Sequence, residues 1–159
     1  MPEFCRTERE GHLLTVTITR PEVMNSLHPP ANQELALAFD EFSADPELWV
    51  AIITGEGDRA FSAGNDLKYQ ATEGGSAVTS PETGFGGLTS RFDNFKPVIA
   101  AVNGVAMGGG FEIASGDIAE LAVARLGGLQ RVHRCVRERH VVRWSSEVAA
   151  RDCAPVADT

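Results

Sequence analysis

Apolar and polar positions follow strand-like periods in three stretches of the chain and a helical period in a fourth. Residues 13–19, LLTVTIT, alternate as in a half-buried strand, and residues 49–54, WVAIIT, form a short apolar run typical of a buried strand. A third run, residues 97–102, opens with a proline that can begin a strand. In residues 29–44, two prolines precede apolar positions at helical spacing, which predicts a helix.

The segments between these elements carry turn and loop residues. Residues 71–87 are rich in glycine, serine, threonine and proline, which predicts a surface loop. We expect a short helix over 88–95 and a longer one over 109–126, where three glycines precede the helical pattern. Strands that alternate with helices indicate an α/β fold, and 159 residues with 43% apolar content are enough for a domain with a hydrophobic core.

Charge and the length of apolar runs argue against several classes of partner. A net charge of −8 disfavours nucleic acid. No apolar run approaches membrane-spanning length, and the N-terminal sequence MPEFCRTERE lacks a signal-peptide core, so we expect a cytoplasmic protein with no membrane partner. The three cysteines, Cys5, Cys135 and Cys153, are odd in number and far apart, which favours reduced thiols over disulfides.

Two segments share one design, in which an apolar strand leads through small residues into a helix start. They are FSAGNDL, residues 61–67, and AMGGGFE, residues 106–112, and we call them the first and second elbow. Two such elbows on neighbouring strands could aim two backbone N–H groups at one oxygen, forming an oxyanion hole beside the carboxylate of Glu112. Spacing alone favours a plainer interpretation, in which small residues allow close packing and Glu112 is a solvated first-turn acid.

Longer stretches around the elbows resemble the crotonase superfamily, the enoyl-CoA hydratase/isomerase family. They are AFSAGNDLK (60–68) and KPVIAAVNGVAMGGGFEIA (96–114), preceded in the same order by RPEVMNSL (20–27). The resemblance runs from about residue 10 to 114 and implies a crotonase-like core of repeated ββα units in a spiral, incomplete at the C-terminus. AGNDLK and the FGGL segment also resemble the carnitinyl-CoA dehydratase branch.

The resemblance implies an acyl-CoA hydratase, dehydratase or isomerase acting on an α,β-unsaturated thioester. In it, the N–H groups of Asn65 and Gly109 would hold the thioester oxygen, and Glu112 would be one of two catalytic glutamates. The residues expected to contact coenzyme A are Ala63, Gly64, Asp66, Leu67 and Met24. Coenzyme A enters as part of the substrate, so no separate cofactor and no metal are expected. The family-typical assembly is a homotrimer or hexamer.

The C-terminal segment departs from the family pattern. Hydratases of the family carry a second glutamate about twenty residues after the first, in a Gly-x-Pro-Glu setting, and residues 115–159 contain no such motif. Residues 1–110 carry a net charge of −8, whereas 111–159 are balanced. We therefore expect a crotonase-like core over 1–114 and an atypical tail over 115–159. The alternative function is a catalytically impaired fragment that binds CoA thioesters.

Two other interpretations of the tail have less support. Its histidines and cysteines match no common spacing of zinc ligands. Its arginines are not interleaved with the aromatic residues of a nucleic-acid surface, so a solvated helix face is the favoured interpretation of the arginines. The residues concerned are His133, Cys135, His140 and Cys153 for zinc, and Arg131, Arg134, Arg137, Arg139 and Arg143 for nucleic acid. His28, between Leu27 and Pro29, is expected to be a loop residue rather than a catalyst.

Overall fold

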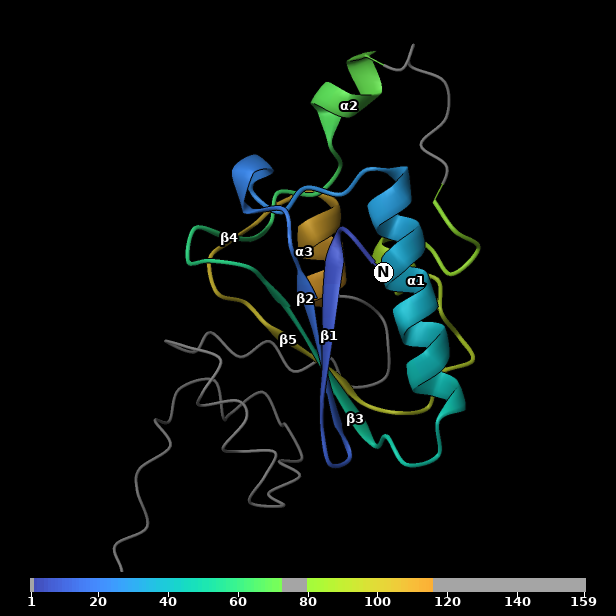
Figure 1. The fold of residues 1–159 in the computed structure, drawn as a ribbon. Coiled ribbons are helices and arrows are strands. Elements are labelled where there is room, and N and C mark those ends of the chain that lie inside the picture. Colours follow the sequence, from blue (N-terminus) through green and yellow to red (C-terminus); the bar gives the residue numbers. More distant parts are fainter. Residues whose placement is uncertain (1, 73–79, 116–159) are drawn as a thin grey trace, which may run out of the picture.

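A computed structural model describes residues 2–72 and 80–115 (Figure 1). Its strands are β1 (Cys5–Glu10), β2 (Leu13–Ile18), β3 (Val50–Gly55), β4 (Ala60–Ser62), β5 (Val98–Ala101) and β6 (Val105–Ala106). Its helices are α1 (Pro29–Ala44), α2 (Leu67–Thr72) and α3 (Gly109–Ser115), with two short 3-10 turns, η1 (Pro21–Val23) and η2 (Phe85–Gly87). These elements alternate as the α/β pattern predicts.

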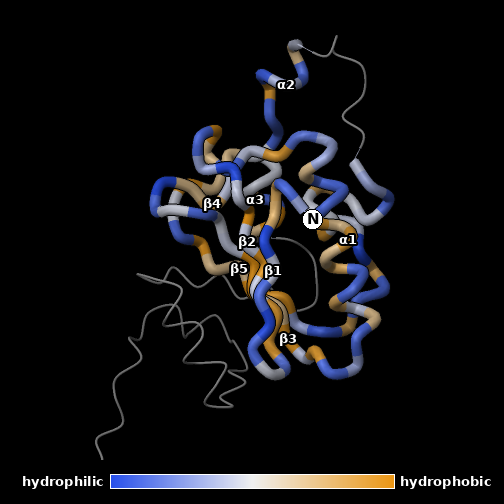
Figure 2. Tube along the Cα trace, in the orientation of Figure 1, coloured by the Kyte–Doolittle hydropathy of each residue, from blue (hydrophilic) through white to orange (hydrophobic). Residues whose placement is uncertain are grey.

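The main sheet has the strand order β1-β2-β3-β5, and α1 lies along one of its faces (Figure 1). Strands β2, β3 and β5 are parallel, and β1 pairs antiparallel with β2 at the edge. The register places Val16, Ile53 and Ala100 side by side in one row. This row belongs to the core that also contains Phe39 and Phe42 of α1, which are fully buried. Figure 2 shows the central strands as apolar and β1 as polar.

The predicted helix over 29–44 and the strands near 13–19, 49–54 and 97–102 are confirmed within a residue or two. The expectation that the first strand is half-buried was wrong, because all six residues of β2 are buried. Its position explains this: a central strand of a largely parallel sheet has neighbours on both edges and is covered on both faces. Its threonines, Thr15 and Thr17, are as buried as its apolar residues.

Strand β1 carries no apolar pattern and was not predicted. Five of its six residues are exposed, and only Cys5 is buried. Its start is fixed to α1 by Glu34, whose carboxylate accepts hydrogen bonds from the backbone N–H groups of Glu3, Phe4 and Cys5 at 2.7–3.2 Å. The strand is stabilised by its pairing with β2 and by the Glu34 carboxylate. Neither contact can be predicted from the hydrophobic pattern of residues 5–10.

The helix predicted over 88–95 is not formed, and a 3-10 turn at Phe85–Gly87 precedes that segment instead. The turn fits between α1 and α3 because its glycines need no room for side chains. Gly86 and Gly87 have φ of +62° and +70°, and their Cα atoms face Ile113 and Ala36. Arg91 then turns inward, donating to the carbonyls of Gly87 and Ala36 at 2.8 and 3.1 Å, which draws the chain away from a helical path.

Candidate active site

A second, two-stranded sheet brings the two elbows together. Strands β4 and β6 are parallel, with Ala60 opposite Val105 and Ser62 opposite Ala106. The N–H group of Met107 donates to the carbonyl of Ser62 at 3.0 Å, just where both strands end. Since parallel strands point the same way, the segments that follow them leave at one edge. The first and second elbow therefore lie side by side.

Glycines allow the elbows to approach through their backbones. Gly64 has a φ of +86°, and a Cβ atom placed on it would lie 2.6 Å from the carbonyl oxygen of Met107 and 2.9 Å from the nitrogen of Gly109. Gly110 faces the carbonyl of Ser62 with no space for a side chain. The small residues that the sequence places in both elbows are required by this contact.

The hydrogen bonds around the elbows set the direction of two N–H groups. The carbonyl of Gly64 accepts from the N–H group of Leu27 at 2.7 Å, so the N–H group of Asn65, across the same trans peptide, points away from Leu27. The carbonyl of Gly108 accepts from the next turn of α3, so the N–H group of Gly109 points out of that helix. Within residues 2–72 and 80–115, neither nitrogen donates to a protein acceptor.

Glu112 lies in the first turn of α3, directly after the second elbow, and is exposed. Its backbone N–H group donates to the carbonyl of Gly108 at 3.0 Å, which fixes the residue to the elbow. No hydrogen bond or ion pair occupies its carboxylate within the part of the chain that the structure describes. The carboxylate is therefore available to solvent and to a ligand held at the elbows.

Asp66, which follows Asn65, is a buried structural carboxylate. Its Oδ1 accepts from the N–H group of Tyr69 at 3.0 Å, which caps α2, and its Oδ2 accepts from the Arg20 guanidinium at 2.9 Å. Burial pushes the pKa of Asp66 upward, but the hydrogen bonds from Tyr69 and Arg20 and the charge of Arg20 together hold it below its usual value. Its carboxylate therefore anchors the first elbow to Arg20 and to α2.

Comparison with known proteins decides which family this is. The Enoyl-CoA hydratase/isomerase family model matches residues 8–124. The chain belongs to this family. Carnitinyl-CoA dehydratases from Citrobacter koseri and Salmonella enteritidis are each 47% identical to it over 114 residues, which are 72% of this chain and 43% of the relative.

Solved structures of family members share the fold. A carnitinyl-CoA hydratase from Mycobacterium avium aligns with a TM-score of 0.65 and 40% identity over 72% of this chain and 44% of that one. An enoyl-CoA hydratase from Mycobacterium tuberculosis aligns with a TM-score of 0.64 and 38% identity over 74% and 45%. The crotonase-like α/β fold class is confirmed, and the chain spans less than half the length of the relatives it matches. The division at residue 114 stays a prediction.

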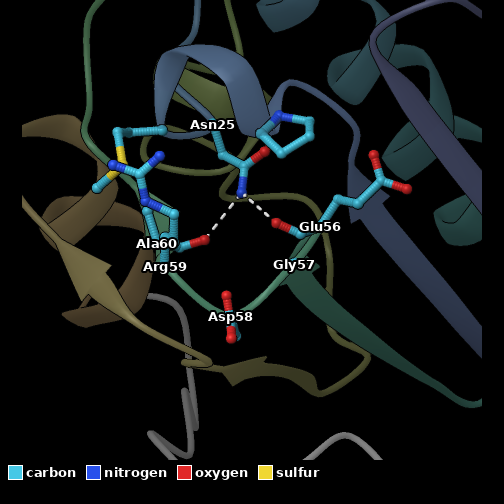
Figure 3. Close-up of a pocket in the computed structure, with 8 residues that line it drawn as sticks. Asn25, Glu56, Gly57, Asp58, Arg59 and Ala60 are labelled. Carbon is cyan, nitrogen blue, oxygen red and sulfur yellow. Dashed lines mark hydrogen bonds between the residues drawn. The ribbon is translucent and has the colours of Figure 1, made fainter.

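A shallow pocket of about 160 Å³ lies beside Met24, at the turn between β3 and β4 (Figure 3). Its floor is the Asn25 side chain, whose Nδ2 donates to the carbonyls of Glu56 and Ala60 at 3.0 and 2.8 Å. Binding sites for small molecules usually measure about 300–1,000 Å³. The pocket is lined by Pro21, Met24, Asn25, Glu56, Gly57, Asp58, Arg59 and Ala60. Its volume is below this range, and Asn65, Gly109 and Glu112 do not line it, so it is not the site of the proposed chemistry.

The remaining residues expected to contact coenzyme A lie along the first elbow. The N–H group of Ala63 donates to the carbonyl of Met24 at 2.9 Å, which joins the elbow to the segment after β2. Gly64 is buried at the contact between the elbows, and Leu67, at the start of α2, is 71% exposed. Met24 and Ala63 are therefore hydrogen-bonded neighbours, and Asn65 lies two residues further along the first elbow.

His28 is the N-terminal cap residue of α1 rather than part of an open loop. The residue is 6% exposed, and its ring makes edge-to-face contacts with the rings of Phe4 and Tyr69, whose centroids are 4.4 and 4.9 Å away. Its buried Nδ1 has no hydrogen-bond partner in the part of the chain that the structure describes. Burial, followed by the charge of Arg20, lowers the pKa of His28, so the ring is neutral. His28 thus packs between two aromatic rings at the start of α1.

No group of three histidine, cysteine or acidic side chains in residues 2–72 and 80–115 could hold a metal ion. Cys5 is buried, and burial, with the charges of two nearby glutamates, raises the pKa of its thiol to about 11, so it stays protonated. The tail residues considered for zinc or nucleic acid lie outside the described residues, as do residues 73–79 of the predicted loop. Across the described ranges, no helix is long and apolar enough to cross a membrane.

Sequence reasoning missed two residues that touch the elbows. Gln70, on α2, accepts a hydrogen bond from the Asn65 side chain at 2.9 Å, and Phe85 packs its ring against the Cα atom of Gly109. Phe85 stood within a predicted surface loop, and a lone glutamine on a short helix carries no signal of function. The contacts arise because α2 begins at the end of the first elbow and η2 packs against α3.

Proposed function

We propose that this chain binds the thioester of an α,β-unsaturated acyl-CoA and stabilises its enolate as part of an acyl-CoA hydratase or dehydratase. The observation that carries the proposal is the contact between Gly64 and Gly109, next to which the N–H groups of Asn65 and Gly109 have no acceptor among the described residues. Membership of the enoyl-CoA hydratase/isomerase family supports the same site.

The chemistry needs both donors at the same oxygen. In hydration, the hydroxyl of water adds to Cβ of the enoyl thioester and a proton adds to Cα, and negative charge builds on the thioester oxygen in between. The N–H groups of Asn65 and Gly109 would stabilise this charge, and loss of one such donor typically costs about 3 kcal/mol of transition-state stabilisation. Glu112 would transfer a proton between water and the acyl group. No cofactor beyond the CoA of the substrate is required.

Phe85 supports a role for the segment before β5 in acyl recognition. Its ring covers one side of Gly109 and is half-buried, so it would form an apolar wall beside the thioester. The curated relatives named carnitinyl-CoA dehydratases make a carnitinyl-CoA-like acyl group the first candidate to test. The trimer or hexamer implied by the family resemblance stays a prediction.

An impaired, thioester-binding function is the second candidate. Residues 115–159 contain no Gly-x-Pro-Glu motif, so one carboxylate would serve where hydratases use two. General acid–base catalysis is typically worth about 10²–10⁴-fold, so we expect hydration to be slower than in a full-length relative by roughly this factor.

Binding and turnover test the two candidates with one ligand, crotonyl-CoA labelled with ¹³C at the thioester carbonyl. We expect the carbon resonance to move downfield on binding, because two hydrogen bonds polarise the carbonyl. Turnover, followed by loss of the enoyl-thioester absorbance, should be slow, and Glu112→Gln should abolish it while binding persists. Glu47→Gln, at an exposed acid in the turn after α1, is the matched control.

Two results would contradict the proposal. Binding with no change in the carbonyl resonance would show that the elbows do not hold the thioester oxygen. Unchanged turnover in Glu112→Gln would show that another group moves the proton. Turnover equal to that of a full-length relative would reject the impaired function and leave the enzymatic one.

A further inference from the structure

We propose that Gln70 is a positioning residue that holds the Asn65 backbone N–H group in the direction of the elbow contact. The inference rests on the proposed function for its catalytic meaning, but the geometry concerns the protein alone. Asn65 Nδ2 donates to Gln70 Oε1 at 2.9 Å, and both residues are half-buried. The carboxamide pair links the first elbow to α2.

Within residues 2–72 and 80–115, the peptide that joins Gly64 to Asn65 forms one direct backbone hydrogen bond, with Leu27. Leu27 forms an isolated bridge to Asn65, by donating to the carbonyl of Gly64 at 2.7 Å and accepting from the N–H group of Asp66 at 3.0 Å. No adjacent rung of a ladder reinforces this bridge. The preceding residue is a glycine with a φ of +86°, whose backbone has the most conformational freedom. The Gly64 side of this peptide is fixed, because the Gly64 N–H group also donates to Ser62 Oγ at 3.1 Å. The Asn65 side is where a further contact would restrain the direction of the N–H group.

Gln70 is well placed to supply that further contact because its own position is fixed. Its N–H group donates to the carbonyl of Asp66 at 3.1 Å, within the first turn of α2. The carboxylate of Asp66 caps the same helix and pairs with buried Arg20. The Asn65 side chain is thus held by Gln70 of α2, and α2 is itself held by the Asp66 carboxylate.

Gln70→Met tests the inference, since methionine keeps the length of the side chain and favours helix but cannot accept the hydrogen bond. Nitrogen relaxation of the full chain without ligand gives a first readout. We expect the order parameter of the Asn65 N–H group to fall from about 0.85 towards 0.6, while that of Gly109 is unchanged. Gln33→Met, the same substitution at an exposed position of α1, should leave both groups unaffected.

Labelled crotonyl-CoA gives a second readout. Gln70→Met should reduce the downfield movement of the bound carbonyl resonance and weaken binding roughly fivefold, the factor that corresponds to one net hydrogen bond. In an Asn65→Ala background, which keeps the backbone N–H group and lacks the carboxamide, Gln70→Met should have no further effect. A role of Gln70 in the stability of α2 alone would persist in that background.

The outcomes separate this inference from the proposed function. An unchanged Asn65 order parameter in Gln70→Met, or an equal effect of Gln70→Met with and without the Asn65 carboxamide, would overturn the positioning role. A lower order parameter together with a wild-type protein that leaves the carbonyl resonance unmoved would support the positioning role and reject the proposed function.

Discussion

Replacing Gly64 by alanine should separate the two elbows, and the structure allows the cost to be worked out. Gly64 has a φ of +86°, and a left-handed conformation costs an alanine about 1–2 kcal/mol. Its Cβ atom would also lie 2.6 and 2.9 Å from backbone atoms of Met107 and Gly109, which cannot rotate aside as a side chain would. Overpacking of this kind typically costs about 1–3 kcal/mol, so we expect Gly64→Ala to lower the free energy of unfolding by about 2–5 kcal/mol.

Gly57 provides a matched control for the conformational part of this cost. Its φ is +81°, close to that of Gly64, and apart from its chain neighbours no atom of the described residues lies within 4 Å of where its Cβ would be. Gly57→Ala should therefore cost only about 1–2 kcal/mol. Urea denaturation followed by circular dichroism measures both variants, and equal slopes of unfolding free energy against urea would show that the extent of unfolding is unchanged.

The difference between the two variants isolates the contact between the elbows. We expect Gly64→Ala to be the less stable by about 1–3 kcal/mol and to lose the downfield movement of the crotonyl-CoA carbonyl. Equal stability of the two variants would mean that the elbows are not in backbone contact, and the proposed oxyanion hole would lose its geometric basis.

The sequence predicted the elements whose limits are set by local chemistry. The helix over 29–44 begins at two prolines and ends before Asp45-Pro46, and its observed range is Pro29–Ala44. Strand β1 escaped prediction because its stability comes from β2 and from Glu34, thirty residues away. The helix predicted over 88–95 is not formed, and here too a tertiary contact matters. Buried Arg91 donates to the carbonyls of Gly87 and of Ala36, which lies 55 residues earlier on α1.

The elbows could be recognised in the sequence, but their contact could not. It depends on the pairing of β4 with β6, whose residues lie more than forty positions apart, and β6 is too short to have a pattern. Asn25 and Asn103 illustrate the same limit. Both are typical turn residues by sequence, yet their side chains bind backbone groups of the β3–β4 turn, Asn103 donating to the carbonyls of Gly55 and Gly57.

Two further predictions concern side chains that support the site from outside it. Lys96 donates to the carbonyls of Phe42 and Asp45 at 2.7 and 2.6 Å, at the C-terminal end of α1. Lys96→Met should therefore lower the free energy of unfolding, measured by urea denaturation, by about 1–2 kcal/mol. Lys68→Met, at an exposed position, should lower it by less than about 0.5 kcal/mol. The other prediction concerns pH. Because the pKa of Asp66 is lower in the folded protein than in the unfolded chain, its ionised form stabilises the fold above about pH 4, and this stability is lost as the pH falls through the lowered pKa. Asp66→Asn keeps an oxygen to cap α2 but leaves the Arg20 charge, whose side chain is 11% exposed, without its counter-ion. We expect a loss of about 3 kcal/mol at pH 7 and a weaker dependence of stability on pH below 4. Wild-type stability at pH 7, or an unchanged acid transition, would show that the ion pair does not anchor the first elbow.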